Sequence, residues 1–214
     1  MKKSFCKLIG AGLMALALSG CGPLIKLPGS GPAPMFYSLT PPALETVAAP
    51  REATLLVEEP LALGGLGGDR IALTPARREM SFFAHARWRD RAPRLMLAAL
   101  IETLEDSKAF KAVIREGAGL RSDYRLKLEL RDFQAEYAGA GAPRVHVRLY
   151  AMLIGQPRGD ILATRQFDHA VPAGGTDMAA IVGAFDEALG GVLGDAAHWV
   201  LRETAPSAPT PNAP

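Results

Sequence analysis

Long apolar runs are scarce in this chain of 214 residues, and the one at the N-terminus is short. Leu8–Leu18 falls well below the roughly 20 residues that a permanent transmembrane helix needs. It follows a start that carries Lys2, Lys3 and Lys7 and no acidic residue. A basic start, a short apolar run and small residues before a cleavage point are typical of a secretory signal peptide. Residues 1–20 are therefore predicted to be removed.

Cysteine is also scarce, since the chain has only Cys6 and Cys21. Cys6 lies in the predicted signal peptide, so the mature domain has no pair for a disulfide, although secretion leads to an oxidising compartment. Cys21 directly follows Leu18-Ser19-Gly20, and this sequence resembles the lipobox of bacterial lipoproteins. The resemblance implies that Cys21 is acylated and becomes the new N-terminus. The alternative is an ordinary signal peptide with an incidental cysteine.

An acylated Cys21 would hold the mature chain on a membrane. Each buried lipid CH₂ contributes about 0.8 kcal/mol, so several acyl chains hold a protein stably where one holds it weakly. Gly22 stands where lipoprotein sorting commonly uses Asp for inner-membrane retention, which favours the outer membrane, facing the periplasm, over the inner membrane. Composition predicts a flexible tether over residues 21–34, a folded domain over 35–204 and a disordered Pro- and Ala-rich tail over 205–214.

The mature chain also lacks an excess of charge of either sign. Without the three lysines of the signal peptide, 21 of the 24 basic residues remain, against 22 acidic ones. A near-neutral domain gives no argument for nucleic acid as a partner. Glu58 and Glu59 stand at a strand end before Pro60, and we interpret them as charged residues that end the strand rather than as catalytic carboxylates.

Motifs of catalysis and metal binding are missing as well. The four histidines His85, His146, His169 and His198 lie apart, at no spacing typical of metal ligands. The Gly-x-Ser-x-Gly sequence of a nucleophile elbow is absent. The glycine-rich loop Gly64–Gly68 lacks the Lys-Ser/Thr sequence of a phosphate-binding loop. We therefore expect no catalytic residue, no metal and no cofactor, although a triad could still be assembled from distant positions.

Apolar periodicity predicts one α+β domain with an antiparallel (mixed) sheet and two long helices packed on one face. The helices are predicted over residues 93–107, with Pro93 in the first turn, and from Thr176 as N-cap to about Glu203. The glycines of the second helix are expected to permit a close approach to a neighbouring element, since each costs about 1 kcal/mol relative to Ala. Strands are predicted over 35–40, 53–59, 70–74, 79–84, 109–116, 123–134, 144–154 and 161–171.

The strand over 123–134 has the clearest pattern. Its apolar residues face one way, and the charged residues from Arg125 to Arg131 face the other. This pattern is typical of a sheet with one packed face and one solvated face, and it argues against helices on both sides. Phe133 breaks the alternation by one residue, which predicts a bulge.

An arginine-rich corner covers Ala86–Arg94, where arginines surround Trp88. We favour a solvated strand-to-helix corner in which Trp88 closes the edge of the core. The alternative is a surface for nucleic acid or phospholipid headgroups. If the corner docks a partner protein, then Arg87, Trp88 and Arg89 are its candidate residues.

The order of these features is similar to that of the ABC-type transport auxiliary lipoproteins, which include PqiC-like intermembrane transport lipoproteins. After the lipobox, the matching segments are Phe36–Thr40, Ala86–Trp88, Leu97–Leu104 with Phe110, and the last helix with Phe185, Ala188, Leu189 and Trp199. The resemblance covers most of residues 35–203. The insertion around Gly64–Gly68 departs from it and leaves the pairing of the first strands open.

The resemblance implies a non-catalytic, outer-membrane lipoprotein that faces the periplasm. It also implies partners, namely an ABC transporter and an MCE-domain protein, with which such a lipoprotein moves lipids between the inner and outer membranes. Two alternatives remain on sequence grounds. One is a structural lipoprotein of envelope assembly or cell-wall attachment, and the other is a membrane-anchored hydrolase.

Overall fold

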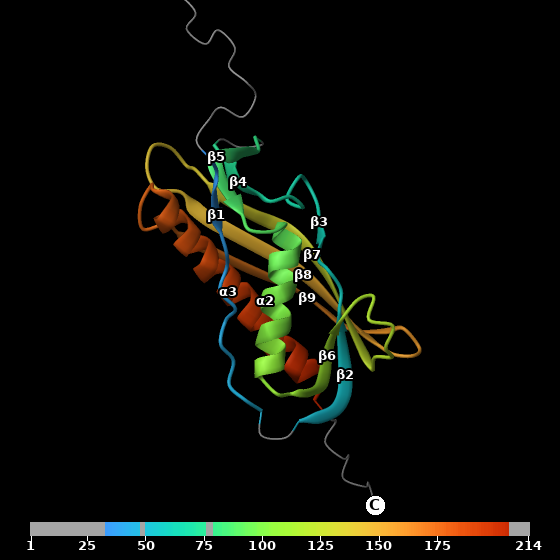
Figure 1. The fold of residues 1–214 in the computed structure, drawn as a ribbon. Helices are drawn as coiled ribbons and strands as arrows, with labels where there is room; N and C mark the ends of the chain where they lie inside the picture. The colour runs from blue at the N-terminus through green and yellow to red at the C-terminus, as the bar shows by residue number, and fades with distance from the viewer. Residues whose placement is uncertain (1–32, 48–49, 76–78, 206–214) are drawn as a thin grey trace, which may run out of the picture. The chain divides into compact units, whose positions relative to one another are not determined.

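The computed structural model describes residues 33–47, 50–75 and 79–205. The predicted signal peptide, Cys21, nearly all of the tether and residues 206–214 of the predicted tail lie outside these residues. The described chain forms one α+β domain of nine strands and two helices, with the helices packed on one face of a mixed sheet (Figure 1). The helices are α2 (Ala92–Asp106) and α3 (Met178–Glu203). The strands are β1 (Met35–Tyr37), β2 (Arg51–Val57), β3 (Leu61–Ala62), β4 (Arg70–Thr74), β5 (Ser81–Trp88), β6 (Phe110–Arg115), β7 (Tyr124–Glu136), β8 (Arg144–Gly155) and β9 (Asp160–Pro172).

Strand β7 lies at the centre of the sheet and uses both of its edges. One edge begins the antiparallel meander β7–β8–β9, as the alternation predicted. The other edge pairs in parallel with β2, β3 and β4 one after the other. The register of β7 and β8 shifts between Leu130 and Asp132, which confirms the bulge predicted from Phe133.

The first strands pair in a way that the sequence left open. Strand β2 lies parallel to β6, and β1 lies parallel to β5. Strands β4 and β5 form the predicted hairpin. The glycine-rich segment joins β3 to β4, so successive short strands can occupy successive positions along the same edge of β7.

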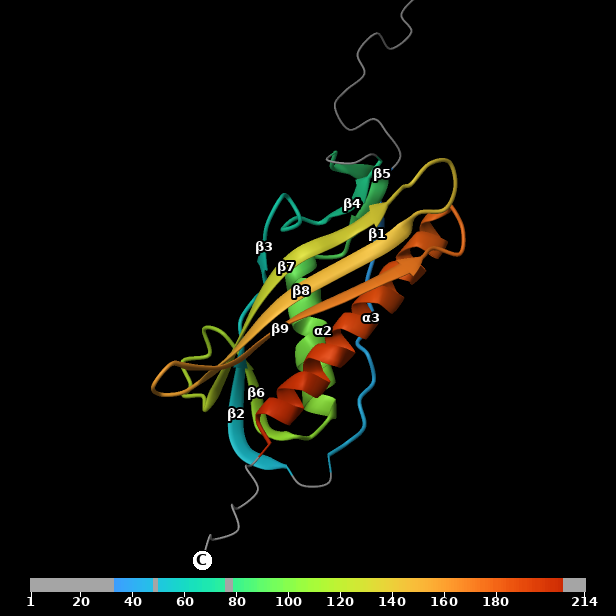
Figure 2. The same ribbon diagram turned by 180° about the vertical axis from the view of Figure 1, so that it is seen from behind.

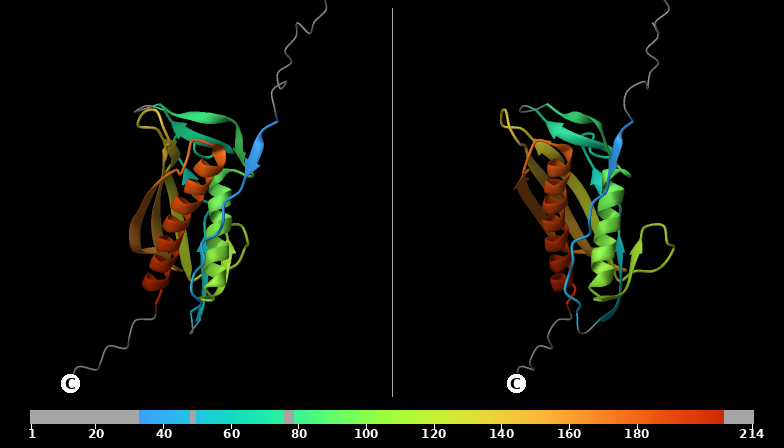
Figure 3. Two further views of the ribbon diagram at one scale, coloured as in Figure 1. Left: turned by 90° about the vertical axis from the view of Figure 1, so that its left-hand side faces the viewer. Right: turned by 60° about the vertical axis from the view of Figure 1, so that its left-hand side comes forward.

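Both helices cover the same face of the sheet. Seen from behind, β7, β8 and β9 lie in front of the helices (Figure 2), and the side views show α2 and α3 next to one another on one side of the strands (Figure 3). Helix α3 packs on β8 and β9, and α2 packs on β6 and on α3. The predicted solvated face is therefore the face of β7 and β8 opposite the helices.

Two details of α3 differ from the sequence-based expectation or refine it. Its N-cap is Asp177 rather than Thr176, because the Asp177 carboxylate accepts a hydrogen bond from the backbone N–H of Ala180 at 3.0 Å. A close approach is present at Gly191, where a Cβ would lie 2.6 Å from Nδ1 of His169 on β9. A Cβ at Gly190 would meet open space, so the predicted close approach to a neighbouring element does not extend to every glycine of α3.

The core lies between the helices and the sheet and contains an aromatic cluster of Trp88, Phe133 and Phe185. Their ring centroids are 4.9–5.4 Å apart, with the Phe185 ring edge-on to both neighbours. These three residues come from β5, β7 and α3, so the cluster joins the hairpin, the central strand and the last helix. Among the described helices, none is long and apolar enough to cross a membrane.

Candidate docking and binding surfaces

The three candidate docking residues of the arginine-rich corner differ in their exposure to solvent. Trp88 is only 1% exposed and belongs to the aromatic cluster, so its side chain offers no surface to a partner. This corrects its place among the candidate docking residues and confirms the interpretation that Trp88 closes the core. Arg87 is half-exposed and pairs with Asp69 at 2.9 Å. Arg89 is exposed, and its backbone N–H donates to the carbonyl of Tyr37 at the end of β1.

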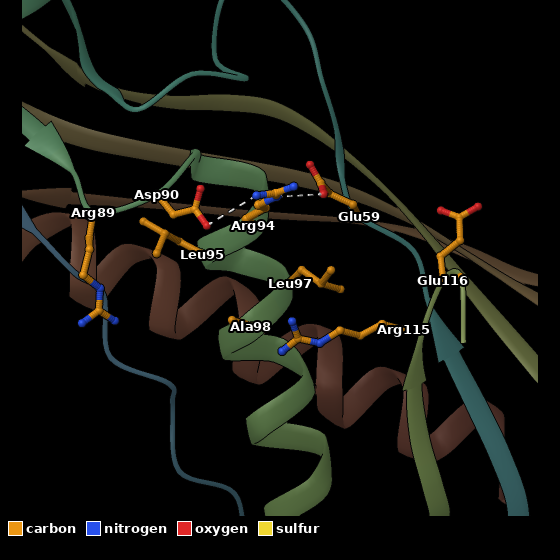
Figure 4. A pocket seen from close by; sticks show the side chains of 10 residues that line it. Glu59, Arg89, Asp90, Arg94, Leu95, Leu97, Ala98, Arg115 and Glu116 are labelled. Carbon is orange, nitrogen blue, oxygen red and sulfur yellow. Dashed lines mark ion pairs between the residues drawn. The ribbon is translucent and has the colours of Figure 1, made fainter. Parts of the chain in front are cut away.

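Arg89 also lines a cleft of about 710 Å³ beside the N-terminal half of α2 (Figure 4). Helix α2 begins here because Pro93 stands in its first turn, where a missing N–H costs no hydrogen bond. Leu95, Leu97 and Ala98 form the apolar side of the cleft. The charged groups come from three places in the chain. Glu59 follows β2, three residues lie around the start of α2, and two lie at the end of β6, namely Arg89, Asp90 and Arg94, and Arg115 and Glu116.

Glu59 joins the two sides of this cleft. Its carboxylate accepts a hydrogen bond from Arg91 at 2.7 Å and lies 3.7 Å from Arg94. Arg94 is in turn 4.0 Å from Asp90 (Figure 4). These pairs are partly exposed, and such pairs contribute only about 0–1 kcal/mol each. Glu59 is therefore a charged residue at the end of a strand, as the sequence suggested, and its partners lie more than 30 residues further along the chain.

The lining of the cleft offers charged groups for ion pairing. Its lining holds three arginines, three carboxylates and small or apolar residues, with no serine, cysteine, histidine or lysine. No nucleophile stands beside a base, which is the geometry that covalent catalysis needs. In the described part of the chain, no cluster of three His, Cys, Asp or Glu side chains is placed to hold a metal ion. The charged lining of the cleft suits recognition of a charged surface.

The solvated face of the sheet carries a second charged arrangement, and His146 on β8 is its centre. Its Nδ1 lies 3.1 Å from Glu136 on β7, and its Nε2 lies 3.0 Å from Asp168 on β9. Carboxylates only accept hydrogen bonds, so both contacts are satisfied when the imidazole carries both protons. Burial lowers the pKa of His146, but the hydrogen bonds and negative charges of Glu136 and Asp168 outweigh it, so the pKa is raised above its usual 6.5.

The neighbouring Asp168 and His169 point to opposite faces of β9, as strand alternation requires. Asp168 contacts His146 on the solvated face, and His169 lies against α3, where its Nε2 is 2.9 Å from Asp195. His146 and His169 therefore make separate contacts on opposite faces of the sheet. His146 and His169 each hold elements of the fold together.

Open strand edges are the remaining candidate for docking. In the described residues β9 pairs with β8 alone, so its outer edge carries unpaired backbone groups along 13 residues. Such an edge can accept a strand from a partner. The alternating sequence predicts that the sheet has an open edge. It does not predict which strand provides that edge, because the order in which strands pair depends on the whole sheet.

A family model described as ABC-type transport auxiliary lipoprotein component matches residues 37–197. A curated protein of Bradyrhizobium diazoefficiens, which is uncharacterized, is 30% identical over 181 residues. That match covers 83% of this chain but only 48% of the relative, so the chain spans about half of the relative's length. Among solved structures, a Xanthomonas campestris protein is 30% identical with a TM-score of 0.73, covering 79% of this chain and 95% of that one. An uncharacterized protein with a TM-score of 0.59 and 15% identity, covering 81% and 99%, shares the fold.

Proposed function

This chain belongs to the family of ABC-type transport auxiliary lipoprotein components, and on that basis we propose that it is a non-catalytic accessory of an ABC/MCE-type system that moves lipids between the inner and outer membranes. It is held by acylated Cys21 on the outer membrane and faces the periplasm. Its partners are the ABC transporter and an MCE-domain protein of that system.

The observation that carries this proposal is the extent of the family match. Residues 37–197 include the whole sheet from β2 onward, all of α2 and most of α3. What precedes the match is the short segment that the sequence assigns to a signal peptide, a lipidated cysteine and a tether. The chemistry of the cleft beside α2 agrees with an accessory role, because its lining can bind charged groups but supplies no nucleophile.

The anchor is tested by Cys21→Ser. We expect this variant to lose incorporation of a clickable fatty acid and to leave the membrane fraction or retain its signal peptide, because no described helix is long and apolar enough to cross a membrane. Separation of the inner and outer membranes by density should place the wild-type protein with the outer membrane. Equal fatty acid labelling of both proteins would overturn the anchor.

Partner docking is tested from Arg89, which we keep as a docking residue together with Arg87. A photoreactive amino acid at position 89 should crosslink a component of the transport system in living cells. Arg158 in the turn between β8 and β9 is a matched control, because it is also an exposed arginine but lies in the meander, outside the arginine-rich corner. Arg87→Glu with Arg89→Glu should weaken partner capture and leave the fold intact, because neither side chain is buried.

The competing proposal is a structural lipoprotein of envelope assembly or cell-wall attachment. The open edge of β9 suits either role, because strand addition does not depend on catalysis. Recovery of an ABC or MCE component from position 89 supports the transport role. Recovery of cell-wall material from position 89, with no transport component, would favour the structural role instead.

A further inference from the structure

The cleft beside α2 has more positive charge than its own carboxylates engage. Glu59 and Asp90 already pair with arginines at the start of α2. Arg89 and Arg115 also line the cleft, and neither makes an ion pair within the described chain. Glu116 is the remaining carboxylate of the lining, and Figure 4 shows it pointing away from the guanidinium of Arg115. The charge that is free to meet a ligand in the cleft is therefore positive.

The backbone fixes where these two arginines stand. Arg89 follows β5, and its backbone N–H donates to the carbonyl of Tyr37 at 2.8 Å, which ties it to β1. Arg115 is the last residue of β6 and pairs with Val57, the last residue of β2. The two side chains thus start from different parts of the sheet, and they lie to either side of α2 (Figure 4). They flank the helix rather than converge on one point.

The surface of α2 between these arginines is small and apolar. Leu95 and Ala98 are half-buried and stand three positions apart, so they share one face of the helix. An apolar centre with charged residues at its rim is typical of protein–protein interfaces, in which arginine is enriched. One small anion could engage both arginines only if their guanidinium groups converged on it, because each group binds through short, parallel hydrogen bonds. A protein segment that carries several carboxylates fits the arrangement better.

The end of α2 does not supply this positive charge. In its first turn the backbone N–H of Ala92 donates to the carbonyl of Gly68 at 3.0 Å. Pro93 has no N–H, and the N–H of Arg94 donates to the carbonyl of Arg91 at 2.9 Å. The N–H groups that bind anions at many helix starts are therefore already used here. The positive charge comes from side chains, so substitutions can remove it.

We infer that the cleft is a docking site for an acidic segment of a protein of the transport system, whose carboxylates pair with Arg89 and Arg115. An apolar side chain of that segment lies on Leu95 and Ala98. This inference rests on the proposed function and adds to it the chemistry of the partner's surface. The mature chain is nearly neutral as a whole, so the attraction acts locally at the cleft, where it steers an acidic partner into place.

The chemistry of the partner can be determined from crosslinks in living cells. A photoreactive amino acid replaces Ala98 in the lining of the cleft, in the full lipoprotein. We expect it to capture a component of the ABC/MCE-type system, through a peptide that carries aspartate or glutamate within a few residues of the attachment point. Capture of a component through a peptide without acidic residues would overturn the inference.

A charge reversal tests the two arginines. Arg89→Glu with Arg115→Glu should lower the yield of the crosslink from position 98 about tenfold, because each attraction becomes a repulsion. Both side chains are exposed, so the thermal midpoint should stay unchanged. Arg121→Glu with Arg158→Glu is the matched control, since it makes the same change in net charge at exposed arginines outside the cleft. The control should retain the wild-type yield.

The outcomes separate this site from the proposed function. Equal yields from position 98 in the two double variants, or an adduct there with the mass of a phospholipid, would overturn the acidic docking site. The proposed function would stand in either case if a photoreactive group at position 89 captured a transport component. Capture of no transport component from either position would refute the proposed function together with the site.

Discussion

The aromatic cluster allows a quantitative test of how α3 is held on the sheet. Phe185 is fully buried and touches Trp88 and Phe133 with centroid distances of 5.2 and 4.9 Å. Phe185→Ala removes the buried ring and leaves a cavity, which costs about 3–5 kcal/mol. The edge-on ring pairs are worth about 0.5–1.5 kcal/mol each beyond their buried area, which favours the upper part of that range. This is a large share of a typical stability of about 5–15 kcal/mol.

The assay is thermal unfolding of the mature domain, followed by tryptophan fluorescence. Trp88 lies against the substituted ring, whereas Trp199 contacts Phe167 and serves as a second reporter elsewhere on α3. For a domain of this size, each kcal/mol corresponds to about 2–4 °C, so the thermal midpoint should fall by about 6–20 °C. Phe185→Leu keeps most of the volume and should cost clearly less. An unchanged midpoint in Phe185→Ala would refute the docking of α3 through this cluster.

Two further predictions concern the sheet and its contact with α3. Gly191→Ala should destabilise the domain, because its Cβ would lie 2.6 Å from the His169 ring, whereas Gly190→Ala should stabilise it by about 0.5–1 kcal/mol through helix propensity; equal thermal midpoints for the two variants would contradict the close approach. His146 has a pKa raised above 6.5, so its contribution to stability is fully present below pH 6.5 and is lost as the pH rises through the folded pKa. The difference in unfolding free energy between wild type and His146→Gln should therefore shrink as the pH increases from 6 to about 9. A difference that grows with pH would contradict a raised pKa of His146.

The sequence determined the elements of this protein because those signals are local. The alternation in β7 and its break at Phe133, the hydrophobic spacing of both helices and Pro93 in the first turn of α2 all act within a few residues. They fixed the fold class, the meander, the single face for the helices and the bulge. The order of the segments also indicated the family, which the match over residues 37–197 bears out.

Tertiary structure decided the contacts that join distant segments. The parallel pairing of β2, β3 and β4 along one edge of β7 could not be read from the chain, because nothing local ties a strand to a neighbour 60 or more residues away. The cleft also depends on contacts between distant segments, since Glu59, the start of α2 and the end of β6 meet only when the sheet is complete.

Trp88 shows, for a single residue, what the local sequence determines and what only the tertiary structure decides. The sequence placed it among arginines, which is compatible with a surface or with the edge of the core. Burial against Phe133 and Phe185 decided between the two, because a large aromatic ring gains most where partners from other elements enclose it on all sides. Local sequence specified that a tryptophan stands at the end of β5, and only the packing of β7 and α3 around it specified that its ring is core.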